Sequence, residues 1–159
     1  MRIAIGADEQ THVTDAVAAE LRRRGHELLP FGRLEADRPE LGEAVRPEDQ
    51  WPAVARAVAE AVAGGQADEG ILFCWTGTGV SIAANKVPGI RAALCDDAAT
   101  ARGARLWNNA NVLCLSLRRT SEVIANEILD SWFNTSFVPN DTDNACLAQL
   151  AAIEKAYHP

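Results

Sequence analysis

The sequence predicts an α/β fold of three layers, in which a doubly wound, five-stranded parallel sheet carries helices on both faces. Five short apolar runs alternate along the chain with longer amphipathic or alanine-rich segments. Strands that are apolar throughout are typical of parallel sheets covered on both sides. Right-handed crossovers then favour a Rossmann-like sheet with the flavodoxin-type strand order 2-1-3-4-5.

Each expected element has a local signal. The strands are the apolar runs, expected at Arg2–Gly6, Glu27–Phe31, Gly70–Cys74, Ile90–Leu94 and Val112–Leu117. The helices are expected at Asp15–Arg24, Pro52–Ala63, Val80–Asn85, Asp97–Leu106, Ser121–Phe133 and Ala145–Ala156. Gly25 stands where glycine commonly ends a helix, and Pro52 where proline commonly begins one. Residues 32–50 are rich in proline and charge, so we expect a long loop there, a kind that is often functional.

Length and composition indicate a single domain, residues 1–159, without internal repeats or a linker. The formal net charge of −7 argues against a nucleic-acid partner, which would usually meet a basic surface. The chain shows neither a signal peptide nor an apolar stretch long enough to span a membrane. Its four cysteines include no C-x-x-C pair and no neighbouring histidine cluster, which argues against a metal site. We therefore expect a reduced, cytoplasmic protein.

The most informative stretch is the one from Gly70 to Cys95. Its first apolar run ends in Cys74, and the turn at residues 76–79 (TGTG) then opens a short helix. Backbone N–H groups and the helix dipole favour negative charge at such a turn, so they can stabilise a thiolate and an oxyanion. The alternative is a structural cysteine in the core beside an ordinary turn. The turn lacks both the lysine-serine ending of a P-loop and the third glycine of a dinucleotide fingerprint.

The predicted topology gathers polar residues at one edge of the sheet. Ligands of doubly wound sheets bind beyond the carboxyl ends of the strands, where the strand order reverses. That point lies between the first and third strands, so Asp8 is expected to face the loop that carries Cys74. Asp96, Asp97 and Arg118 follow the fourth and fifth strands and are expected to line the same edge.

Several segments resemble the family of type B ribose-5-phosphate isomerases and galactose-6-phosphate isomerases. The resemblance covers nearly the whole chain. It is most specific in SIAANKVPGIRAALC (81–95) and NNANVL (108–113), and IAIGAD near the start agrees with it. It implies a five-stranded Rossmann-like sheet, a homodimer with active sites at the subunit interface, and aldose–ketose isomerisation of sugar phosphates without a metal or other cofactor.

The resemblance also implies roles for individual residues. Cys74 matches the cysteine that moves a proton between C1 and C2 of the open-chain sugar, and Thr76 matches a hydroxyl residue implicated in ring opening. The loop whose N–H groups stabilise the enediolate corresponds to Gly77, Thr78 and Gly79. Such chemistry needs a positioned base and preorganised donors.

Substrate contacts are implied in the same way. Asp8 matches an acidic residue beside the substrate, and Asn85 and Asn111 lie in segments that contact sugar hydroxyls. Arg118 is a cation that this chain retains near the end of the fifth strand.

The chain departs from the family at four places. Glu9 replaces a phosphate-binding histidine, and Asp96 replaces a histidine used in ring opening. The loop at Asn140–Cys146 has no arginine or histidine where the family has a G-G-R-H-x-x-R segment, and Trp75 stands where a glycine is usual. The usual phosphate site is therefore expected to be rebuilt or absent.

The sequence thus predicts an isomerase that interconverts an aldose and a ketose, either sugars or sugar phosphates, through an enediol. Two alternatives stay open. The substrate could lack a phosphate, or the chain could be a sugar-binding or regulatory relative without turnover. Retention of Cys74 and Thr76 favours an enzyme, whereas loss of both family histidines favours a sugar-binding or regulatory relative without turnover.

Overall fold

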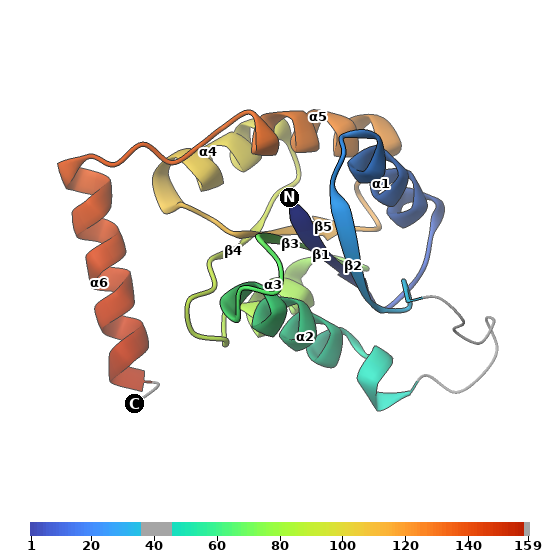
Figure 1. The fold of residues 1–159 in the computed structure, drawn as a ribbon, viewed down its shortest axis with the longest axis horizontal. Coiled ribbons are helices and arrows are strands. Elements are labelled where there is room, and N and C mark those ends of the chain that lie inside the picture. The colour runs from blue at the N-terminus through green and yellow to red at the C-terminus, as the bar shows by residue number, and fades with distance from the viewer. Residues whose placement is uncertain (36–45, 158–159) are drawn as a thin grey trace.

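Five parallel strands form one sheet at the centre of the molecule, with helices on both faces (Figure 1). The computed structural model describes residues 1–35 and 46–157. The strands are β1 (Arg2–Ala7), β2 (Glu27–Gly32), β3 (Glu69–Cys74), β4 (Ala92–Leu94) and β5 (Val112–Ser116). The helices are α1 (His12–Arg23), η1 (Pro47–Asp49, a 3-10 turn), α2 (Trp51–Ala63), α3 (Thr78–Ala84), α4 (Ala98–Asn108), α5 (Glu122–Phe133) and α6 (Asp141–Tyr157). The predicted fold class is confirmed. Most of the long loop expected at 32–50 lies outside the described residues.

The order of the last two strands differs from the prediction. The sheet runs β2-β1-β3-β5-β4, so β5 pairs with β3 and β4 lies at the edge. Helix α4 explains the order, because its buried Ala101 and Ala104 share a core with α1 and α5, while α2 and α3 fill a separate core. A right-handed crossover places α4 on the α1 face only if the chain steps back from β4 to β5.

Helix α2 lies unusually close to the sheet, because glycines replace side chains beneath it. A Cβ atom added to Gly6 would stand 2.7 Å from Val54 and 2.8 Å from Val58, and one on Gly70 would stand 2.9 Å from Val58. Real Cβ atoms essentially never approach other atoms so closely. The two glycines therefore let the valines of α2 sit directly against the strands.

The buried carboxylate of Glu69 ties the start of β3 to α4 and α5, on the face of the sheet opposite α2. Glu69 accepts a hydrogen bond of 2.6 Å from Nε1 of Trp132 and forms an ion pair with Arg105 at 2.6 Å. Burial raises the pKa of Glu69, and the hydrogen bond from Trp132 and the charge of Arg105 oppose that rise. Arg105 also donates to the carbonyl of Thr135, and so holds the start of the linker that leads to α6.

The free edge of β4 is covered by one amide side chain. The backbone groups of Arg91 and Cys95 are directed toward β5, since Arg91 O accepts from Asn111 N and Cys95 N donates to Cys114 O. Because successive residues of a strand alternate in direction, the N–H and C=O of Ala92 point away from β5. Asn85, just after α3, accepts from Ala92 N at 2.9 Å and donates to Ala92 O at 2.8 Å and to Ser81 O at 2.9 Å. Its amide therefore takes the place of a neighbouring strand.

We predict that Asn85→Ala lowers the free energy of unfolding by about 1–2 kcal/mol, because exposed backbone groups lose their partners and water replaces them only in part. Urea denaturation would measure this. The matched control is Asn126→Ala on the exposed face of α5, expected to change stability by less than about 0.5 kcal/mol. Unchanged stability of the Asn85 variant, with weakened sugar binding, would contradict the structural role and support the substrate contact instead.

Candidate active site

Cys74 ends the central strand β3, and neighbouring backbone fixes the loop that follows it. The carbonyl of Cys74 accepts from Gly77 N at 3.2 Å and from Leu117 N at 3.0 Å. The next carbonyl, that of Trp75, accepts from the backbone N–H of Arg118 and from the hydroxyl of Ser116, both at 3.0 Å. Hydrogen bonding from the β5 side therefore continues beyond the end of β3.

The turn needs glycine at its centre. Gly77 has φ 74°, a left-handed conformation that other residues rarely adopt. A Cβ atom there would lie 2.5 Å from Leu94 and 3.0 Å from the backbone of Leu115. Helix α3 begins at the next residue, and among the described residues no side chain caps this end. The first N–H groups of α3 have no partner within the helix, and they lie in the turn that directly follows Cys74.

The thiol itself is nearly buried, since Cys74 is 5% exposed and belongs to the core that α2 and α3 share with the sheet. The side chains after it lie on the surface: Trp75 is 58% exposed, and Thr76 and Thr78 are exposed with their hydroxyl oxygens 2.7 Å apart. A buried thiol beside exposed hydroxyls marks a boundary between core and solvent.

The acidic residues occupy different environments. Asp8, just after β1, is half-buried, and its pKa is raised mainly by burial and further by the charge of Glu9. Glu9 is exposed. Asp96 is exposed and lies 3.5 Å from Arg119, whereas Asp97 caps α4 by accepting from Thr100 N at 2.7 Å. A carboxyl group with a raised pKa in a partly buried position is suited to exchange protons.

The order of the strands sets which predicted residues share this edge. Cys74 is paired in register with Ser116, so Arg118 comes just beyond the same ends of the strands. Its side chain is exposed and forms no ion pair within the described ranges. Asp8 follows the end of β1, which pairs with β3 on the other side. Predicted residues from three strands thus lie beyond the same, carboxyl, ends of the strands.

Asn111 lies at the opposite, amino-terminal, end of the strands. It precedes β5, at the opposite end of the strand from Ser116. Its side chain accepts from Arg91 N at 2.8 Å and donates to Gly89 O at 2.9 Å. Like that of Asn85, its amide group is hydrogen-bonded to the backbone. Within one chain Asn111 does not face the Cys74 loop.

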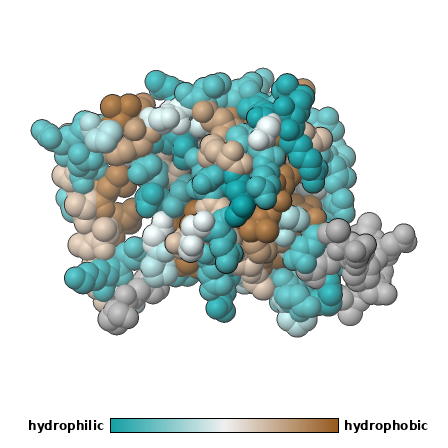
Figure 2. All heavy atoms as spheres, in the orientation of Figure 1, coloured by the Kyte–Doolittle hydropathy of each residue, from teal (hydrophilic) through white to brown (hydrophobic). Residues whose placement is uncertain are grey.

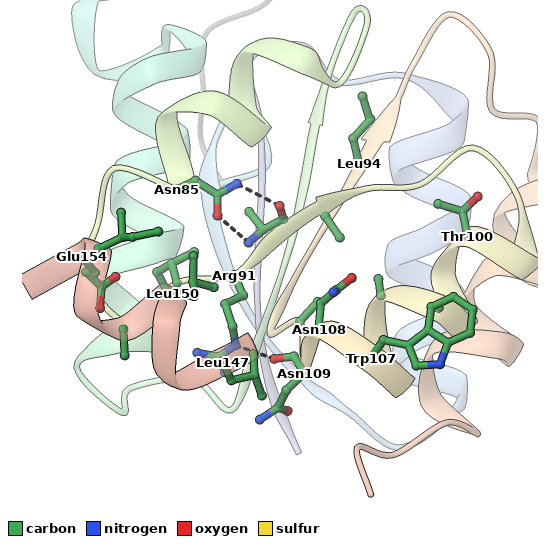
Figure 3. A pocket seen from close by; sticks show the side chains of 18 of the residues that line it. Asn85, Arg91, Leu94, Thr100, Trp107, Asn108, Asn109, Leu147, Leu150 and Glu154 are labelled. Carbon is green, nitrogen blue, oxygen red and sulfur yellow. Dashed lines mark hydrogen bonds between the residues drawn. The ribbon is translucent and has the colours of Figure 1, made fainter. Parts of the chain in front are cut away.

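A separate cavity of about 1320 Å³ lies between α6 and the β4–α4 side of the body (Figure 3). Leu147, Leu150 and Ile153 of α6 line one wall, and Trp107 and Asn108 at the end of α4 line another. No residue of α6 is buried, and Figure 1 shows the helix standing off to one side. Figure 2 shows hydrophobic atoms on the side of α6 that faces the body.

Sequence reasoning missed this cavity. The apolar spacing of Leu147, Leu150 and Ile153 was available as a signal, but it could not show that the stripe would stay uncovered. A hydrogen bond from Gly89 N to the Glu154 carboxylate, 2.8 Å long, connects the helix to the body.

The described residues contain no group of three or more His, Cys, Asp or Glu side chains arranged to hold a metal ion. They also contain no helix with the length and apolar character needed to cross a bilayer.

Comparison with known proteins identifies the family. Residues 3–150 match the family model described as Ribose/Galactose Isomerase. The chain is 36% identical over 137 residues to ribose-5-phosphate isomerase B of Escherichia coli, covering 86% of this chain and 85% of that one. It is 42% identical over 106 residues to D-erythrulose-4-phosphate isomerase 2 of Mycolicibacterium smegmatis, covering 67% and 70%. The solved structure of ribose-5-phosphate isomerase B from Clostridium thermocellum matches with a TM-score of 0.85 at 36% identity, over 99% of both chains. The chain therefore belongs to the ribose/galactose isomerase family of sugar-phosphate isomerases.

Proposed function

We propose that this chain interconverts an aldose and a ketose with Cys74 as the base. The observation that carries the proposal is the position of Cys74, at the end of a central strand and directly before a glycine turn that opens a helix. Relatives of this chain are named as isomerases of sugar phosphates. A thiol that acts as a base must stay reduced, which fits a cytoplasmic location.

The proposed reaction moves one proton between neighbouring carbons. The Cys74 thiolate takes the proton from C2 of the open-chain aldose, and the electron pair moves through C2–C1 to the carbonyl oxygen. The N–H groups of Gly77, Thr78 and Gly79 stabilise the resulting enediolate. A proton passes between the two oxygens through Asp8, whose raised pKa suits this exchange. The thiol then returns its proton to C1, which gives the ketose.

Ring opening precedes that step and needs a proton donor and acceptor near the ring oxygen. Thr76 is proposed for this task together with Thr78, because their hydroxyls are hydrogen-bonded and exposed. Asp96, which stands where relatives carry a histidine, is proposed as the neighbouring acid–base group. Arg119 lies 3.5 Å from its carboxylate.

A binding protein without turnover is the second candidate, favoured by the carboxylates of Glu9 and Asp96 at positions where the family has histidines. A screen in heavy water separates the two. Ribose 5-phosphate, erythrose 4-phosphate, ribose and erythrose are each incubated with the protein, and deuterium incorporation at C2 is read by NMR. Incorporation into any of them supports an isomerase, and binding without incorporation supports the second candidate.

We predict that Cys74→Ala lowers turnover by about 10²–10⁴-fold, the usual contribution of a general base, while the fold remains intact. Rates on the best substrate of the screen, with circular dichroism, measure both effects. Cys146→Ala, which removes the exposed thiol of α6, is the matched control and is expected to keep the wild-type rate. A Cys74→Ala enzyme with a near wild-type rate removes this thiol from the role of base.

We further propose that the substrate is not ribose 5-phosphate. Asp8 and Glu9 stand together at the carboxyl edge, and Asn140–Cys146 supplies no cation. A carboxylate about 4 Å from a phosphate charge repels it by about 4 kcal/mol at a surface-like dielectric. Arg118 remains as a cation that could bind an anionic group at this edge. A shorter or unphosphorylated sugar needs fewer cations.

Ribose 5-phosphate is predicted to be a poor substrate, with kcat/KM below about 10⁴ M⁻¹s⁻¹, the lower end of the ordinary enzyme range. Glu9→His is expected to lower KM only in part, because a histidine does not replace the bidentate contacts of arginine. Glu9→Gln, which removes the charge alone, is the comparison variant. A wild-type value at or above that limit would show that the phosphate site has been rebuilt.

We also propose a homodimer whose active sites are shared. Helix α6 exposes Leu150 (47%), Ile153 (57%) and Tyr157 (80%) beside an apolar cavity, with no buried residue of its own. Unpaired apolar surface of this kind usually marks an interface. A second copy that fills the cavity would cover these side chains and bring Trp107 and Asn108 against its partner.

Sedimentation velocity is expected to give the mass of two 17.1 kDa chains over a wide range of concentrations. Leu150→Asp combined with Ile153→Asp is expected to produce monomers that lose turnover, since charge in an apolar interface is costly. Gln149→Asp, an exposed position on the same helix outside the cavity lining, is the control and should remain dimeric. A fully active monomer would defeat the shared site.

A further inference from the structure

The first residue of α2, Trp51, packs against Gly79, which is the second residue of α3 and the last residue of the glycine turn at 76–79. A Cβ atom added to Gly79 would meet three atoms of the Trp51 ring, Cε3 at 3.0 Å, Cδ2 at 3.1 Å and Cε2 at 3.4 Å. All its neighbours within 3.4 Å would thus be atoms of one indole. Gly79 carries no side chain, so the ring lies directly against the backbone of the turn.

Two sets of contacts fix the position of this indole, one made by valines of α2 and one made by Asp49 just before the helix. The valines of α2 press against the glycines of β1 and β3, which fixes the height of the helix above the sheet. Asp49, fully buried just before α2, lies 3.1 Å from Arg46 Nε and 4.0 Å from Arg33 Nη1, and Arg33 follows β2. The pair between Asp49 and Arg33 ties the segment just before α2 to the carboxyl end of β2. Trp51 is two residues beyond Asp49.

Trp51 is not a core residue. It remains 41% exposed, whereas Trp132, the tryptophan of the core, is fully buried. Its ring covers Gly79, and the rest of the side chain is open to solvent. A large apolar side chain left half in water beside a glycine turn contributes little to the core, but it limits the movement of that turn.

We propose that Trp51 is a positioning residue of the active site, which packs on Gly79 and holds the turn at residues 77–79 in place relative to Cys74. The inference rests on the proposed function, since it assigns the turn the task of stabilising an enediolate. Hydrogen-bond donors act on a transition state only when their geometry is fixed beforehand. Trp51 supplies that constraint from outside the turn, without contact with the reacting atoms.

The first test compares Trp51→Ala with Trp51→Phe. Trp51→Ala is expected to lower kcat by about 10–100-fold while KM changes less than about threefold, because a displacement of about 1 Å in a donor costs rate more than binding. Trp51→Phe keeps an aromatic ring and is expected to recover most of kcat. Arg56→Ala, on the exposed face of the same helix, is the matched control and should leave both constants unchanged.

The second test does not depend on catalysis. Hydrogen exchange of the amides of residues 77–80, followed by NMR, is expected to become at least about tenfold faster in Trp51→Ala and to stay unchanged in Arg56→Ala. Gly79→Ala is expected to displace the indole and to lower kcat as well. Once the ring is gone the added methyl group has room, so the double variant should be no worse than Trp51→Ala alone.

Unchanged exchange at residues 77–80 in Trp51→Ala would overturn the proposal, and so would a wild-type kcat. Strictly additive losses in the double variant would also overturn it, because they would show that Trp51 and Gly79 act separately. If the wild-type protein deuterates no sugar in the heavy-water screen, the proposed isomerase function fails. The exchange experiment then still decides whether Trp51 holds the turn.

Discussion

The structure depends on the central position of β3, which is hydrogen-bonded to a strand on each side and buried along its whole length. A strand held in this way has no freedom to shift its register, because both neighbours would have to move with it. Its last residue, Cys74, is therefore fixed more firmly than a loop residue would be. Backbone bonds from Leu117 and Arg118 extend this constraint into the turn. Precise placement of the thiol, and of the chain as far as Trp75, therefore follows from the sheet itself.

The strands and helices could be predicted because each has a local pattern, but the order of the last two strands could not. An apolar run such as Ala92–Leu94 shows that a strand forms, and nothing in it shows which strand lies beside it. The side of the sheet that α4 covers decides the order, and this depends on alanines that meet α1 and α5 only in the fold. The alternation of elements predicted the doubly wound architecture, and the comparisons bear out the resemblance read from the segments at 81–95 and 108–113.

The candidate site was predictable in part. The motif around Cys74 can be found in the sequence because its residues are contiguous. Asn85 and Asn111 have structural partners 7 and 20–22 residues away, so their use by the backbone could not be foreseen from spacing. The contact of Trp51 with Gly79 joins residues on separate elements in the same way. What the sequence could not predict is therefore the set of long-range contacts that hold the motif in place.

Both edge strands of the sheet are protected against pairing with strands of other chains. At one edge, the amide of Asn85 occupies the outward-facing groups of Ala92. At the other edge, β2 carries Pro30, which has no N–H to offer, and the bonding of Glu27 and Arg33 to the β1 side places Pro30 among its outward-facing residues. Strands from other chains therefore find few free groups to pair with at either end. Pairing of sheet edges between chains, the first step toward fibrous aggregates, is therefore disfavoured even though α6 leaves apolar side chains exposed.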